Sequence, residues 1–166
     1  MLAELAIGVL VVGLLIYRQL VARRLSAAGV RIALILAVLG ILETVQYLQK
    51  QHHIGGVAVA ALGGSLVLAV AFGVARAVTV RIWQKDGSTW SQGSWITALL
   101  WIAALAAHLG YDYLLDKHHG TSGLGDATIL LYLAVTLGAQ RLVLLQRASR
   151  MFPGTPSAPS FGTGPA

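Results

Sequence analysis

The stretch that decides the fold is residues 95–120, WITALLWIAALAAHLGYDYLLDKHHG. Its length and apolar character fit a membrane helix, because a helix needs about 20 residues to cross the bilayer. Its second half nevertheless carries His108, Tyr111 and Asp112. Because ionisable groups inside a bilayer need polar partners, we expect other helices to arrange themselves around this one.

The composition agrees with a membrane protein. Hydrophobic residues make up 57% of the chain and charged residues 11%, whereas soluble domains carry about 25% charged residues. The absence of cysteine excludes disulfides and thiolate metal sites in this chain. We therefore expect one transmembrane domain in residues 1–150. The Pro/Gly/Ser-rich residues 151–166 are expected to form a disordered cytoplasmic tail.

Apolar runs predict an all-α bundle of five transmembrane helices, in residues 2–20, 31–49, 54–80, 95–116 and 126–145. Arginines follow the first, third and fifth runs, which places the N-terminus outside and the C-terminus in the cytoplasm. The protein is thus expected to be a multi-pass protein of the inner (plasma) membrane. Its net charge of +6 is expected to orient it in the lipid bilayer, and nucleic acid is not an expected partner.

Small residues recur at every fourth position in the third run, as Ala69, Gly73 and Ala77. Such a stripe lets helix backbones approach closely, so this helix is expected near the centre of the bundle. Arg76 lies one turn from the end of the same run, and we expect its side chain to extend to the membrane surface.

The connection between the third and fourth runs is RIWQKDGSTWSQGS, residues 81–94. Asp-Gly between two β-prone segments predicts a short β-hairpin in the cytoplasm. Tryptophans favour the headgroup level. The expected interfacial loop therefore comprises Trp83, Asp86, Gly87, Trp90 and Trp95.

Residues 73–95, GVARAVTVRIWQKDGSTWSQGSW, resemble the central signature of the CcdC-like family of small bacterial integral membrane proteins. In that family a helix ends in a basic, β-prone strand, turns at Asp-Gly and leads into the next span. The resemblance implies a protein of the bacterial envelope, encoded near cytochrome c maturation genes. It implies no catalytic residues, because the family's activity is not established. An accessory or interaction protein with other membrane proteins as partners is the function we expect.

Polar residues of the second run fall on one helical stripe. Glu43, Gln46 and Tyr47 are spaced i, i+3 and i+4, which places them on one face. They lie at a depth comparable to that of the polar residues in the fourth run, so the two faces are expected to meet. The predicted buried polar cluster consists of Glu43, Gln46, Tyr47, His108, Tyr111 and Asp112.

Three interpretations of this outer region remain open. The first is a hydrogen-bonded structural network. The second is a haem or transition-metal site, for which imidazoles are suitable ligands; the candidates are His52, His53, His108, His118 and His119. The third is a membrane enzyme acting on a lipophilic substrate, with Glu43 or Asp112 as the acid and His108 as the base. No motif names a substrate, so a non-enzymatic role is preferred.

Overall fold

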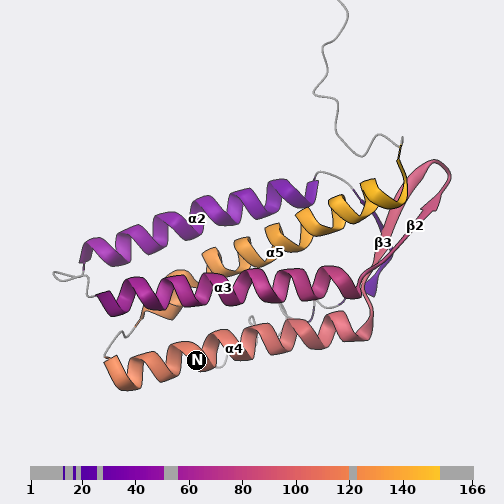
Figure 1. The fold of residues 1–166 in the computed structure, drawn as a ribbon. Helices are drawn as coiled ribbons and strands as arrows, with labels where there is room; N and C mark the ends of the chain where they lie inside the picture. The colour runs from indigo at the N-terminus through magenta and orange to yellow at the C-terminus, as the bar shows by residue number, and fades with distance from the viewer. Residues whose placement is uncertain are drawn as a thin grey trace, which may run out of the picture.

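Four long helices dominate the computed structural model, which describes residues 13, 17, 20–25, 28–50, 56–119 and 123–153 (Figure 1). They are α2 (Ala28–Lys50), α3 (Gly56–Thr79), α4 (Trp95–His119) and α5 (Leu124–Met151). Each is long and apolar enough to cross a membrane, which supports a multi-pass membrane protein. The predicted first span, residues 2–20, falls almost entirely outside the described residues. Residues 154–166 of the predicted tail, which was expected to span residues 151–166, also lie outside them.

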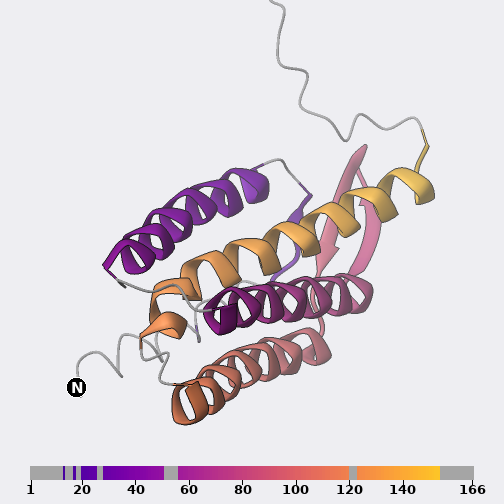
Figure 2. The same cartoon turned by 60° about the vertical axis from the view of Figure 1, so that its left-hand side comes forward.

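The helices are arranged in the order α2, α5, α3, α4 (Figures 1 and 2). α5 packs extensively against both α2 and α3, whereas α4 packs mainly on α3 and has few contacts with α5. α3 is therefore an inner helix, in agreement with its stripe of small residues. Long aliphatic side chains on the outer faces of α2 and α4 remain exposed, among them Leu34, Ile35, Leu99 and Ile102, as expected for helices surrounded by lipid.

Two glycines allow α5 to approach its neighbours closely. A Cβ atom at Gly73 of α3 would lie 2.6 Å from the carbonyl oxygen of Thr136 and 2.8 Å from the Cβ of Ala139. A Cβ atom at Gly40 of α2 would overlap the backbone of Leu131. Close backbone contact of this kind maximises dispersion between helices that lack a hydrophobic driving force in lipid.

α5 is longer than predicted, because it continues past residue 145 to Met151. Arg147 in this extension donates hydrogen bonds to the carbonyl oxygens of Ala77 and, at 3.2 Å, Val80. The last carbonyls of a helix have no partner within the helix. The arginine therefore provides hydrogen bonds to carbonyl groups at the end of α3 and just after it.

A small antiparallel sheet lies at one end of the bundle and contains β1 (Arg23–Arg24), β2 (Arg81–Lys85) and β3 (Ser88–Gln92). We call this end the hairpin end. The predicted β-hairpin is confirmed: β2 pairs with β3, and Asp86 and Gly87 have φ angles of 50° and 67°. Positive φ at both turn residues matches the twist of a two-residue hairpin.

The third strand is a departure from the predicted all-α fold with a lone hairpin. β1 pairs antiparallel with β3, so the strand order is β1-β3-β2 (Figure 2). The backbone N–H of Leu25 continues the pairing with a 2.8 Å hydrogen bond to the carbonyl of Thr89. Leu25 and Ile82 also pack on a buried cluster at the ends of α3 and α5, which fixes the sheet to the helices.

We expect Gly40→Ala to destabilise the bundle by about 1–3 kcal/mol, because its methyl group would force α2 away from the backbone of Leu131. The measurement is unfolding in detergent, by heat or by sodium dodecyl sulfate. Gly63→Ala on α3 is the control, since a Cβ there meets no atom within 4 Å and alanine favours the helix. Equal losses in both variants would contradict close packing at Gly40.

Candidate functional site

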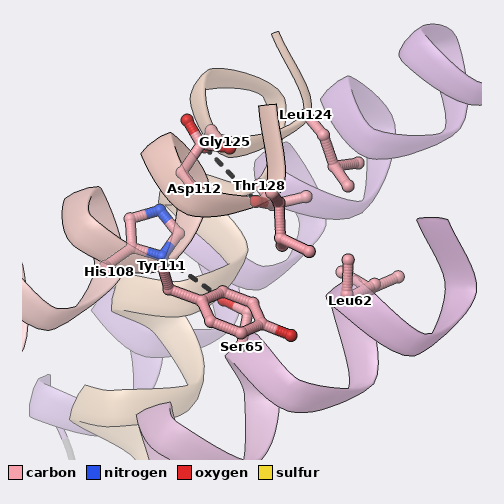
Figure 3. A pocket seen from close by; sticks show the side chains of 10 residues that line it. Leu62, Ser65, His108, Tyr111, Asp112, Leu124, Gly125 and Thr128 are labelled. Atoms are coloured by element: carbon pink, nitrogen blue, oxygen red, sulfur yellow. Dashed lines mark hydrogen bonds between the residues drawn. The ribbon is translucent and has the colours of Figure 1, made fainter. Parts of the chain in front are cut away.

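His108 of α4 is buried between three helices, with only 2% of its surface exposed. Its Nδ1 atom lies 3.3 Å from the hydroxyl oxygen of Ser65 on α3, at hydrogen-bonding distance (Figure 3). Its ring stacks on Tyr132 of α5, with ring centroids 4.4 Å apart. Its Nε2 atom has no hydrogen-bond partner among the described residues. The side chain thus links α4 to both α3 and α5. Its Nε2 atom remains without a hydrogen bond to any described residue.

A small cavity of about 10 Å³ adjoins His108, which is room for about one water molecule. Its lining includes the polar residues Ser65, His108, Tyr111, Asp112 and Thr128, together with Gly125 (Figure 3). The Asp112 carboxyl group occupies the space that a side chain at residue 125 would fill. Glycine at this position therefore allows the start of α5 to lie against α4.

The α4 residues of the predicted polar cluster lie together in the structure, whereas two of its α2 residues lie apart from them. His108, Tyr111 and Asp112 line the same cavity. Glu43 and Gln46 lie on the exposed surface of α2, and the cavity is lined by α3, α4 and α5 alone. The predicted burial of Glu43 and Gln46 is therefore wrong, and so is the pairing of Glu43 with His108 as acid and base.

Packing on α5 explains the orientation of α2. The buried residues of α2 are Ala33, Gly40 and Thr44, and Thr44 donates a 3.2 Å hydrogen bond to the carbonyl of Ala127. Successive residues of a helix are about 100° apart, so burying Thr44 turns Glu43 away from the bundle. Tyr47 is half-buried, and its ring is 3.5 Å from where a Cβ of Gly123 would lie.

The proposed metal ligands are largely outside the described side chains. His52 and His53 fall outside the described residues, and the side chains of His118 and His119 at the end of α4 are likewise not described. Within the described part, no three His, Asp or Glu side chains are grouped so that they could hold a metal ion. His108, the remaining candidate, contacts Ser65 and Tyr132 instead.

Arg76 of α3 is fully buried, with 0% of its surface exposed. The expectation that it extends to the membrane surface is wrong. Its guanidinium carbon lies 3.9 Å from the ring centroid of Trp101 on α4. Nε, Nη1 and Nη2 have no hydrogen-bond partner in the described part of the chain. Insertion scales assign a cost of about 2.5–3.5 kcal/mol to an arginine at the centre of a membrane helix. Arg76 lies three residues before the end of α3, and buried ionisable residues in membrane spans are usually functional.

The sequence contained a signal for the burial of Arg76. It lies three residues after Gly73 and seven after Ala69, which are the small residues predicted to face the bundle centre. Residues at these spacings share one helix face, so Arg76 belongs to the buried stripe. Its aromatic partner Trp101 could not be identified from the sequence, because it lies on another helix whose rotation the sequence does not specify.

Two threonine hydroxyl groups near this arginine are hydrogen-bonded to each other. The hydroxyl oxygens of Thr79 and Thr97 are 2.8 Å apart, and Thr97 is completely buried. Thr97 also accepts a 3.0 Å hydrogen bond from the backbone N–H of Ser94 at the start of α4. These contacts anchor the ends of α3 and α4 where the hairpin leaves the bundle.

Comparison with protein-family models, with curated proteins and with solved structures found no match to this chain. The site is therefore interpreted from its own geometry. Its buried hydroxyls are largely hydrogen-bonded within the bundle, its cavity is the size of a water molecule, and Arg76 is a buried cation without a hydrogen-bonded partner among the described residues.

We expect Tyr132→Phe to lower the free energy of unfolding by about 0.5–1.5 kcal/mol. The substitution removes the 2.9 Å hydrogen bond from the Tyr132 hydroxyl to the carbonyl of Ala104, which joins α5 to α4. Tyr113→Phe is the matched control, because Tyr113 is 66% exposed on α4. Unfolding in detergent measures both variants, and an equal response would show that the buried hydroxyl contributes nothing specific.

Proposed function

We propose that this chain is an accessory or interaction protein of the bacterial envelope, similar to CcdC-like proteins. It spans the plasma membrane five times, with its N-terminus outside and its C-terminus in the cytoplasm. Its partner is another membrane protein, which it contacts through the sheet at the hairpin end. The sheet itself is the observation that carries this proposal.

The distribution of charge supports the orientation. Exposed basic residues are concentrated at the hairpin end, as Arg23, Arg24, Arg31, Arg81, Lys85 and Arg150. The carboxylates of the described helices lie toward the opposite end, as Glu43, Asp112, Asp116 and Asp126. Basic residues are retained on the cytoplasmic side of membrane proteins. An additional crossing by residues 2–20 would then place the N-terminus outside.

The form of the sheet supports a role in interaction. β2 is an edge strand, because the strand order is β1-β3-β2. One side of its backbone therefore has no partner strand within the described sheet, and such edges pair readily with other chains. Arg81, Gln84 and Lys85 on this strand are exposed. The edge is thus suited to an extended, acidic segment of a partner.

The size of the cavity beside His108 argues against an organic substrate bound at this histidine. Small-molecule sites usually enclose about 300–1,000 Å³, and the cavity beside His108 is about 10 Å³. With Glu43 on the outer surface of α2, Asp112 is the candidate acid that still lines the cavity with His108. The buried histidine and its hydroxyl partner are then best explained as a contact that holds three helices together.

Single cysteines test the topology, since the chain has none of its own. We expect Lys85→Cys to react with a membrane-impermeant maleimide only after the cells are opened, and Lys117→Cys to react in intact cells. Both lysines are exposed, at the hairpin end and near the end of α4 respectively. Reaction of both from the same side would contradict the orientation.

Photocrosslinking in cells tests the interaction. We expect a photoreactive amino acid at Gln84 on the edge of β2 to give a discrete protein adduct that the same residue at Lys117 does not give. Because the partner segment is acidic, Arg81→Gln together with Lys85→Gln should reduce the adduct about tenfold, the effect of roughly 1.4 kcal/mol of lost ionic contact.

Lys50→Gln removes one positive charge at the far end of α2 and serves as the control for charge loss away from the sheet, which should leave the adduct unchanged. If position 84 crosslinks to lipid alone, or if the adduct is insensitive to the loss of Arg81 and Lys85, the sheet is a membrane anchor and the interaction proposal is wrong.

A further inference from the structure

Arg76 and Trp101 define a position in the bundle that the function proposed above does not use. The guanidinium is fully buried and covered on one face by the indole ring. We propose that these two residues form a binding site for a single phosphate-type oxyanion, which is either the phosphate of an anionic lipid or free phosphate. The inference is independent of whether the sheet binds a partner protein.

The chemistry of the guanidinium selects the ligand class. The guanidinium carbon lies over the Trp101 ring, 3.9 Å from its centroid, and the N–H bonds of a guanidinium lie in its plane and point outward at its edge. The three nitrogens at that edge make no hydrogen bond with any described residue. Two parallel N–H groups match two oxygens of a phosphate or carboxylate, so an oxyanion completes this arrangement.

The described carboxylates lie too far away to fill this role. Asp86 is in the turn of the hairpin, between β2 and β3. Asp112 follows Trp101 by eleven residues on α4, which corresponds to about 16 Å along a helix. Glu43, Asp116 and Asp126 also lie toward the end opposite the hairpin. The counter-ion of Arg76 must therefore come from outside the described chain.

The position of Arg76 favours a phosphate from the adjoining membrane surface. It precedes the end of α3 at Thr79 by three residues, about 4.5 Å along the helix axis. Exposed Arg31, Arg81 and Arg150 at the same end attract anions to this surface.

The test uses the full chain in a maltoside detergent, which contains no phosphate. Trp83→Phe, Trp90→Phe and Trp95→Phe are combined, so that Trp101 is the one remaining tryptophan of the four. Its fluorescence is followed during titration with short-chain phosphatidylglycerol and, separately, with inorganic phosphate. Saturable change with the lipid alone identifies a lipid headgroup site, and equal binding of both ligands identifies a site for the free oxyanion.

In the same background, Arg76→Gln should weaken binding about tenfold or more, as expected for loss of a charge-assisted bidentate contact. Arg150→Gln removes an exposed charge at the same end and should change binding less than about twofold, the effect of a screened surface charge. Arg76→Lys keeps the charge but loses the planar fork, and should bind several-fold more weakly than the parent. It also provides the decisive comparison if Arg76→Gln does not fold.

The proposal is overturned by no saturable change with either ligand, by equal weakening in Arg150→Gln and Arg76→Gln, or by parental affinity in Arg76→Lys. Glu4→Gln is a further control, because Glu4 is the acidic residue of the chain that lies outside the described part. If this variant binds phosphate much more tightly than its parent, Glu4 is the counter-ion of Arg76 and no external anion is needed.

Discussion

The close approach of α5 to α2 and α3 is the contact on which the rest of the bundle depends. Gly40 and Gly73 bring the helix backbones together, and this proximity lets side chains of one helix reach carbonyl groups of the next. Thr44 reaches Ala127 across the first of these interfaces, and Arg147 reaches the end of α3 across the second. In lipid, where polar groups find no water, such short bridges determine which helix rotations are stable.

The buried polar residues differ in how completely this packing satisfies them. The Tyr132 hydroxyl is fully engaged with α4, and His108 uses one ring nitrogen and leaves the other beside a water-sized cavity. The guanidinium of Arg76 lies over Trp101 and makes no hydrogen bond with any described residue. These three residues therefore differ in how many of their polar atoms are hydrogen-bonded. Tyr132 and His108 hold the helices together, whereas Arg76 is the residue best placed to bind a ligand. The candidate ligand site therefore lies near the hairpin end and not at the histidines.

The sequence was sufficient for features whose signal is local. Apolar runs located the described helices, and Asp86-Gly87 located the hairpin. It failed where the outcome depends on which helices are neighbours. Glu43 and Gln46 form a polar stripe, but α2 packs on α5 through Gly40 and Thr44, so that stripe faces outward. β1 is only two residues long, so its own residues do not predict a strand. It is a strand because it pairs with β3.

The pairing of β1 with β3 also imposes an order on assembly. Arg24 lies opposite Trp90, and a ribosome that adds about 5–20 residues per second needs roughly 3–13 seconds to synthesise the chain between them. α2 and α3 are both synthesised during that interval, before the central strand exists. The sheet therefore closes only after the chain of both helices has been made, and its closure ties the start of α2 to the start of α4.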